Sequence, residues 1–205
     1  MKKTVFMILI IALLAAVSVC CAQETAPGGD KSLYDKAYKL YEKQKYYEAH
    51  EMFIESQYGD WERMAKKCVR RWPKNGQLWY DTSQWLRDTQ LTFKVEQPED
   101  TAVYIEVYKD GKLFSQVFVG GTDEITIGVP GNQTYTIKDG VGSDWFGPEE
   151  AFGPVGAYET MLFTKNEKDN IYLEARYNYM ITINVEDAVG EPIGSEDELW
   201  EDFSH

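Results

Sequence analysis

The feature that most constrains this 205-residue chain is a change in the spacing of its apolar residues near Gln90. Downstream of that point apolar side chains occupy every second position, which is the period of a β-strand with one buried face. The alternating segments are Leu91–Val95, Val103–Val107, Ser115–Val119, Ile125–Val129, Tyr135–Ile137, Ile171–Leu173 and Tyr179–Val185. Because they are short, and because turn signals such as Lys109–Lys112 (KDGK) separate them without a helical pattern, we expect an antiparallel β-sandwich.

Upstream of this point the apolar spacing is helical. Tyr46, Ala49 and Phe53 stand where a tetratricopeptide repeat places the Tyr, Ala and Phe of its second helix, and Asp60 precedes a third helical stretch. One repeat and a further helix are too few for a solenoid, in which stacked repeats bury each other's faces. Two interpretations stay open: a peptide-binding groove, or an accessory helical unit that packs against its neighbour. The two patterns together predict an α+β fold of two units, a short tetratricopeptide-like helical segment followed by an all-β antiparallel sandwich.

The first residues have the features of an export signal. Two lysines precede the apolar run Val5–Val19, which is about 15 residues long and therefore short for a membrane span. Two processing routes fit the residues that follow: ordinary cleavage before Gln23, or lipidation at Cys20 or Cys21. We therefore expect an exported protein, either extracellular or on the outer face of the bacterial cytoplasmic membrane. Its contact with the membrane would be limited to the signal or a lipid anchor.

Changes in composition divide the chain into five parts. The predicted parts are a signal peptide (1–22), a polar linker (23–31), the helical unit (32–88), the β-sandwich (89–185) and an acidic tail (186–205). Four tryptophans lie close together before the boundary between the helical unit and the sandwich. Large aromatic side chains this dense near a junction predict a seam between the two units.

Negative charge is concentrated in the second half of the chain. Residues 30–88 hold 12 Lys and Arg against 10 Asp and Glu, whereas residues 89–205 hold 7 against 23. A surface of this sign repels phosphate backbones, so we expect no nucleic-acid partner. The plainer explanation for the acidic residues is solubility outside the cell. We expect the partner to be a protein or a cell-surface component, with a glycan as the alternative.

The residues also exclude several kinds of reaction centre. His50 and His205 do not combine with other residues into a convincing Ser–His–Asp set, and no HExxH, CxxC or EF-hand spacing predicts a metal site. Cys68 is the one cysteine after the signal, so it has no intramolecular disulfide partner, and its helical setting predicts a buried thiol. We expect no cofactor, no metal and no enzyme activity. A glycoside hydrolase that uses two carboxylates is the remaining enzyme reading, and the acids are too numerous to nominate a pair.

The segment Gly142–Glu159 reads GSDWFGPEEAFGPVGAYE and groups aromatic, acidic and glycine residues. In one interpretation it is a binding site with an exposed aromatic stacking surface and carboxylates that hold a sugar or a cation. The candidate ligand-binding residues in that case are Asp144, Trp145, Phe146, Glu149 and Glu150. In the other interpretation, which we favour, the aromatic rings fold inward and close one end of the sandwich, because such rings bury large apolar areas when they can.

Four motifs distinguish the chain after the signal: WPKNGQLW, VYKDGKLFSQVFVGG, VPGNQTYTIKDGVGSDWFGPEEAFG and GSEDELWEDF. They resemble an uncharacterised exported, lipoprotein-like module of Gram-positive bacteria, in which tetratricopeptide-like helices precede a β-sandwich with a WFGxEExFG loop. The strand Gly131–Lys138 is also similar to part of a transthyretin-like or collagen-adhesin B-type sandwich. No established activity comes with the module, so the resemblance implies location and fold and leaves the function open.

These observations predict an exported, non-catalytic binding or interaction protein at the bacterial cell surface. The alternative is a carbohydrate-binding module that uses the loop of Trp145 and Phe146. A glycoside-active enzyme is the second alternative.

Overall fold

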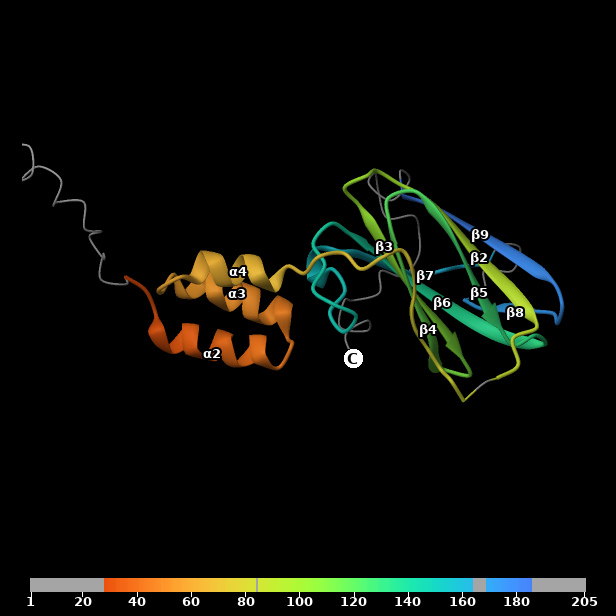
Figure 1. Ribbon diagram of the computed structural model, residues 1–205, viewed down its shortest axis with the longest axis horizontal. Helices are drawn as coiled ribbons and strands as arrows, with labels where there is room; N and C mark the ends of the chain where they lie inside the picture. Colours follow the sequence, from red (N-terminus) through yellow and green to blue (C-terminus); the bar gives the residue numbers. More distant parts are fainter. Residues whose placement is uncertain (1–27, 84, 164–168, 186–205) are drawn as a thin grey trace, which may run out of the picture.

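The computed structural model describes residues 28–83, 85–163 and 169–185. Within these residues three α-helices are followed by a mostly antiparallel β region, and Figure 1 shows the helices at one end of an elongated molecule. The predicted lipidation sites Cys20 and Cys21 and the acidic tail 186–205 lie outside the described residues. None of the described helices is both long enough and apolar enough to cross a membrane.

The three helices pack around small and apolar side chains. They are α2 (Lys31–Glu42), α3 (Tyr46–Ser56) and α4 (Trp61–Cys68). Their shared core consists of Ala37, Ala49, Phe53, Met64, Ala65 and Cys68. Ala37 of α2 and Ala49 of α3 are fully buried, and their small size lets these two helices lie close together. Burial raises the pKa of the Cys68 thiol to about 12, which confirms the expected buried, unreactive thiol.

The larger of two sheets has six strands in the order β1–β4–β3–β6–β7, and β8 pairs with another part of β6. These strands are β1 (Gly76–Tyr80), β3 (Ala102–Lys109), β4 (Lys112–Gly120), β6 (Gln133–Gly142), β7 (Ala157–Thr160) and β8 (Ile171–Leu173). All of the pairs are antiparallel. Asp110 and Gly111 join β3 to β4 with φ angles of 53° and 70°, which are the left-handed values that the predicted Asp-Gly hairpin turn requires.

The smaller sheet has three strands in the order β5–β2–β9. They are β2 (Thr89–Glu96), β5 (Asp123–Val129) and β9 (Asn178–Asn184). β2 and β5 are antiparallel, but β2 and β9 are parallel, so the expectation of an entirely antiparallel β region is wrong for this pair. The physical reason is that no hairpin joins β2 to β9. β9 follows β8, which belongs to the larger sheet, and strands without a direct turn between them can pair in either direction.

One apolar core contains side chains from both sheets. Phe93 and Ile127 from the smaller sheet and Ile105, Val117 and Ile137 from the larger sheet all belong to it, and each is almost completely buried. Each of these residues occupies an apolar position of an alternating segment, so the period of two identified the buried face correctly. Burying a side chain of this size contributes about 1.5–3 kcal/mol to folding.

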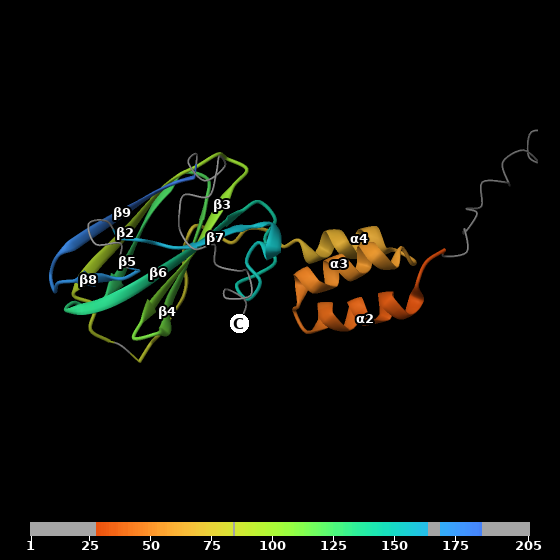
Figure 2. The same cartoon turned by 180° about the vertical axis from the view of Figure 1, so that it is seen from behind.

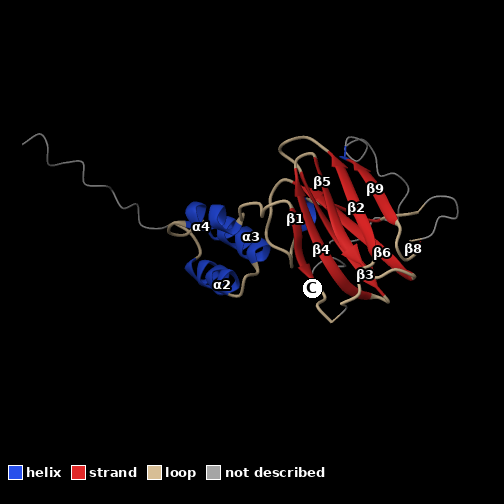
Figure 3. Ribbon diagram, turned by 45° about the vertical axis from the view of Figure 1, so that its right-hand side comes forward, coloured by secondary structure: helices blue, strands red, loops and turns tan. Residues whose placement is uncertain are grey.

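The β region begins before residue 89, the boundary that the sequence suggests. β1 pairs with β4 from Gly76 opposite Phe118 to Tyr80 opposite Ser115, and its register shifts between Gln77 and Trp79. Figure 3 shows β1 at the edge of the larger sheet on the side of the helices. A five-residue strand with an interrupted register has no clean alternation, which is why the sequence pattern missed it.

A carboxyl group lies inside the β region. Asp139 follows Ile137 by two positions on β6, so its side chain is on the core-facing side of the sheet, opposite Ile105 of β3. The residue is 2% exposed, and its Oδ1 has no hydrogen-bond partner within the described part of the chain. Desolvation, with a smaller contribution from the charge of Glu159, raises the pKa of Asp139 well above its ordinary value.

We expect the substitution Asp139→Asn to change how stability depends on pH. An aspartate of the unfolded chain ionises near pH 3.9, whereas the folded protein resists ionisation of Asp139 to a higher pH. Protonated Asp139 contributes its full stabilisation below about pH 3.9. This contribution is lost as the pH rises through the pKa of Asp139 in the folded state. The Tm of the variant relative to wild type should therefore increase as the pH is raised from about 4 to about 8.

Thermal melts of both proteins across that pH range measure the difference. The matched control is Glu124→Gln, which neutralises an exposed carboxylate on β5. A Tm difference between Asp139→Asn and wild type that stays constant with pH would contradict the assignment of a protonated carboxyl at this position.

Candidate functional site

The segment 142–159 runs from the end of β6 into β7, and its aromatic side chains are packed rather than exposed. Trp145 is 4% exposed, Phe146 is 3% exposed and Phe152 is fully buried. The Trp145 ring makes edge-to-face contacts with Tyr104 and Phe118 of the larger sheet, at centroid distances of 5.1 and 5.0 Å. A sugar cannot stack on rings that the protein itself covers. This burial corrects the interpretation in which Trp145 and Phe146 form an exposed stacking surface.

The same segment joins the helices to the β region, as Figure 2 shows beside the ends of α3 and α4. The Phe146 ring contacts the rings of Tyr47 and His50 on α3, at centroid distances of 5.3 and 5.6 Å. The backbone N–H of Arg70, just after α4, donates to the Trp145 carbonyl at 2.7 Å. The two units therefore meet at this loop. Of the four tryptophans predicted to form the seam, Trp72 packs against the cluster that contains Trp145, whereas Trp79 is exposed.

Glu150 caps a helix that lies about a hundred positions earlier in the chain. Its Oε2 accepts a hydrogen bond of 2.9 Å from the backbone N–H of Tyr47, in the first turn of α3. The residue at the N-cap position of α3, Lys45, makes no side-chain cap hydrogen bond of its own. The Glu150 carboxylate thus accepts the hydrogen bond that a Ser or Asp at the N-cap position would otherwise accept. It also lies at the positive end of the helix dipole.

The environment of Glu150 has opposing effects on its pKa. The residue is 2% exposed, and desolvation is the larger effect, so the pKa of Glu150 is raised. The backbone N–H groups of Tyr47, Glu48 and Tyr46 lower it, because they stabilise the ionised form. This arrangement is that of a structural carboxylate at a seam, and Glu150 is not positioned as a ligand to bound sugar or cation.

The other two acidic residues predicted at this site are exposed. Asp144 and Glu149 face solvent, whereas Glu150 turns toward α3. The structure therefore does not bring the three carboxylates together at one ligand. Among the described residues, no group of three or more His, Cys, Asp or Glu side chains is arranged to hold a metal ion.

A buried polar cluster attaches the loop to the sheet. Glu106 of β3 is fully buried and accepts hydrogen bonds from the hydroxyl of Tyr108 at 2.6 Å and from Nε2 of Gln116 at 3.2 Å. The Tyr104 hydroxyl lies 3.3 Å from Oε1 of Glu106 and 3.2 Å from the carbonyl oxygen of Pro148 in the loop. Sequence reasoning missed this cluster because Glu106 alternates with core residues, which predicts a solvent-facing side chain.

A second group of residues, of which only Phe114 is buried, lies where the loop after β1 meets the β3–β4 hairpin; we name it the β1 corner. Its members are Tyr80, Asp81, Trp85, Arg87, Lys109, Asp110, Lys112 and Phe114. The backbone N–H of Asp81 donates to the Phe114 carbonyl at 2.8 Å, which fixes the loop against the hairpin. The guanidinium of Arg87 lies 4.0 Å from the ring centroid of Tyr80 and 5.9 Å from that of Phe114.

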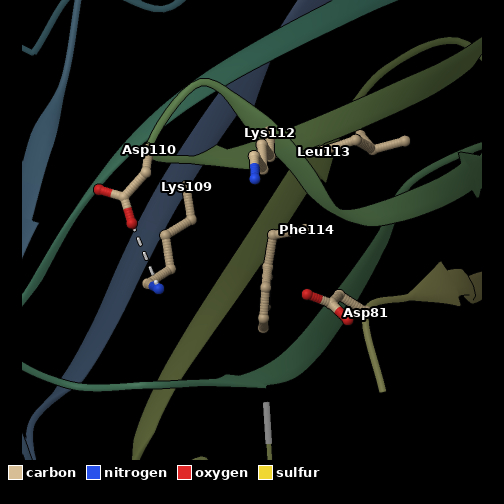
Figure 4. Close-up of a pocket in the computed structure, with 6 residues that line it drawn as sticks. All are labelled: Asp81, Lys109, Asp110, Lys112, Leu113 and Phe114. Carbon is tan, nitrogen blue, oxygen red and sulfur yellow. Dashed lines mark ion pairs between the residues drawn. The ribbon is translucent and has the colours of Figure 1, made fainter. Parts of the chain in front are cut away.

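A hollow of about 170 Å³ lies in the β1 corner (Figure 4). Its lining consists of Asp81, Lys109, Asp110, Lys112, Leu113 and Phe114. Two carboxylates and two ammonium groups give this lining a formal charge of zero, in contrast to the net charge of −13 of the whole chain. Lys109 Nζ lies 3.4 Å from Oδ2 of Asp110, as the dashed line in Figure 4 marks.

Trp85 is the most exposed large apolar residue of the described chain, with 88% of its surface exposed. It belongs to the short loop that Arg87 closes by donating from Nη2 to the Asp81 carbonyl at 3.4 Å. Trp85 is four positions after Asp81, so their Cα atoms lie within about 14 Å of each other. It is also two positions before Arg87, whose guanidinium lies over the ring of Phe114 in the hollow's lining. Sequence reasoning assigned this tryptophan to the seam, and its exposure corrects that assignment.

Comparison with protein-family models, with curated proteins and with solved structures finds no match to this chain.

The burial of Trp145 predicts a large loss of stability on truncation. We expect Trp145→Ala to lower the free energy of unfolding by about 3–5 kcal/mol, because it leaves a cavity between β3, β4 and the loop. For a chain of this size the Tm should fall by roughly 6–20 °C. Trp85→Ala is the matched control, because an exposed tryptophan should change stability by less than about 0.5 kcal/mol. Equal melts for the two variants would contradict the packed arrangement.

The cap on α3 makes a second prediction about the loop. We expect Glu150→Ala to lower the free energy of unfolding by about 1–2 kcal/mol, because the backbone N–H of Tyr47 in the first turn of α3 loses its acceptor. Chemical unfolding followed by circular dichroism measures this change. Glu149→Ala is the matched control, since Glu149 is an exposed neighbouring carboxylate. An unchanged Glu150→Ala protein would show that the cap does not stabilise the fold.

Proposed function

We propose that this protein is an exported, non-catalytic binding protein of the bacterial cell surface whose binding surface is the β1 corner. The observation that carries the proposal is the exposure of Trp85 in the loop after β1, between Asp81, which lines the hollow, and Arg87, which lies over the ring of Phe114. A tryptophan held at 88% exposure contributes little to the fold, and exposed aromatic anchors are typical of binding surfaces.

The architecture is proposed to be a tetratricopeptide-like helical unit on a β-sandwich. The single apolar core shared by two sheets supports the sandwich. Ala37, Ala49 and Phe53 at the centre of the helical core support the likeness to a tetratricopeptide repeat, in which these positions are packed. The ends of α3 and α4 are occupied by the loop, which supports the interpretation of the helices as an accessory unit that packs against its neighbour.

Export and cell-surface location rest on the predicted signal and on the resemblance to an exported, lipoprotein-like module. A non-catalytic role is supported by the distribution of ionisable groups among the described residues. Glu106, Asp139 and Glu150 are buried, and the hydrogen bonds of Glu106 and Glu150 tie parts of the fold to one another. Catalytic carboxylates, by contrast, must be able to reach a substrate.

The proposal is tested by binding of the labelled chain, from Gln23 onward, to intact cells and envelope fragments of the producing bacterium. We expect saturable binding by the wild type and a loss of at least about tenfold in affinity for Trp85→Ala, because central aromatic anchors dominate binding energy. Tyr38→Ala is the matched control, since Tyr38 is an exposed aromatic residue on α2, 43% exposed and far from the β1 corner in the chain. Absence of binding by the wild type, or equal binding by the two variants, would contradict the proposal.

A further inference from the structure

The β1 corner has the chemistry to recognise a neutral carbohydrate, and we propose that its ligand is an uncharged oligosaccharide segment. The inference rests on the proposed function, because it names the ligand class of the same binding surface. It depends on three properties of the corner: its aromatic surface, its charge balance and the fixed position of its polar groups.

The aromatic surface suits the apolar face of a sugar ring. Trp85 presents a wide ring to solvent, and Tyr80 is partly exposed while the Arg87 guanidinium lies over its ring. One face of a pyranose is a row of C–H groups, which can pack on an aromatic ring without removing any hydroxyl group from water. A tryptophan beside a shallow, partly apolar hollow therefore offers a sugar burial of apolar surface at little cost of desolvation.

The charge balance of the hollow argues against ionic ligands. Asp81 and Asp110 offset Lys109 and Lys112 in the lining. The one further charge of the β1 corner, the Arg87 guanidinium, lies over the rings of Tyr80 and Phe114, so the hollow itself attracts neither anions nor cations strongly. A phosphate or a nucleic acid would in addition meet the negative field of the whole chain, whose net charge is −13. A sugar hydroxyl can donate to a carboxylate and accept from an ammonium group, so a lining with both kinds of group suits a neutral polyol.

The polar groups of the corner are held in place before any ligand arrives. The Asp81 carboxylate accepts from the Ser83 backbone N–H at 2.8 Å and from the Ser83 hydroxyl at 2.9 Å. These two bonds lower the pKa of Asp81, so the group is an ionised acceptor at neutral pH. The hairpin turn fixes the backbone at Asp110, and the bond from Asp81 N–H to the Phe114 carbonyl joins the two segments. Fixed donors and acceptors reduce the entropy lost on binding.

A protein partner fits the corner less well. A stable protein interface buries at least about 1,000 Å² in total and has an apolar centre surrounded by a polar rim. Here the strongly exposed aromatic surface is one short loop, and charged side chains form most of the adjacent hollow. The geometry is that of a site for a few sugar units, with the chain of the ligand continuing across the surface.

Affinity gel electrophoresis and titration calorimetry with neutral polysaccharides test this inference. The probes are starch, mixed-linkage β-glucan, cellulose-derived oligomers, xylan, galactomannan and chitin-derived oligomers. We expect at least one probe to retard the wild-type chain and to be recovered uncleaved. Trp85→Ala should weaken that binding at least about tenfold, Trp85→Phe should restore most of it, and Tyr38→Ala should leave it unchanged. Thermal melts of the variants show whether each is folded.

Absence of binding to every neutral probe would overturn the inference, as would binding that Trp85→Ala does not weaken. The cell-binding experiment separates this failure from failure of the proposed function. If Trp85→Ala weakens binding to cells while every neutral probe fails, and if protease treatment of the cells abolishes the binding, the β1 corner binds a protein. The ligand class is then wrong, and the binding function stands.

Discussion

The loop between β6 and β7 connects the two halves of the molecule, and its burial is the constraint on which their arrangement depends. Trp145 faces the larger sheet and contacts Tyr104 and Phe118, whereas the adjacent Phe146 contacts Tyr47 and His50 of α3. Two neighbouring aromatic residues thus contact the two different units. Because Glu150 also caps α3, separation of the helices from the β region would expose aromatic surface and leave the first turn of that helix without its cap.

The loop has a composition typical of binding sites, but its residues hold the two units together. Carboxylates next to aromatic rings are typical of sugar and cation sites, but here the carboxylate satisfies backbone N–H groups and the rings contact other rings. Glu106 shows the same principle on the outer face of the sheet, where the loop covers the strand and the carboxylate has partners within the protein. Buried charges are tolerated where hydrogen bonds replace those of water.

The β1 corner differs because its polar groups and the rings of Tyr80 and Trp85 remain in contact with solvent. Asp81 and Asp110 are held by local turns, and Trp85 projects from a short loop whose ends are tied together. A rigid frame that carries exposed loops is the usual arrangement of binding proteins. The two loops therefore have different roles. The loop of Trp145 joins the two units, and the loop of Trp85 is available to a ligand.

The sequence by itself determined the type of secondary structure in each half, because the spacing of apolar residues reflects which face of a helix or strand is buried. It located the helices and most of the strands, the buried face of each strand, the Asp-Gly hairpin and the buried Cys68. It missed β1, whose register is interrupted, and β7, which is only four residues long. It also missed the direction of β9, which no local turn fixes. Only the tertiary structure decided which aromatic residues are covered. Trp85 and Trp145 lie in similar turn-rich segments, and the difference is that helices and sheet close over one of them and not over the other. Contacts between residues far apart in the chain, such as Glu150 with Tyr47, leave no local pattern in the sequence. Neither residue belongs to a repeat or motif that would indicate its partner.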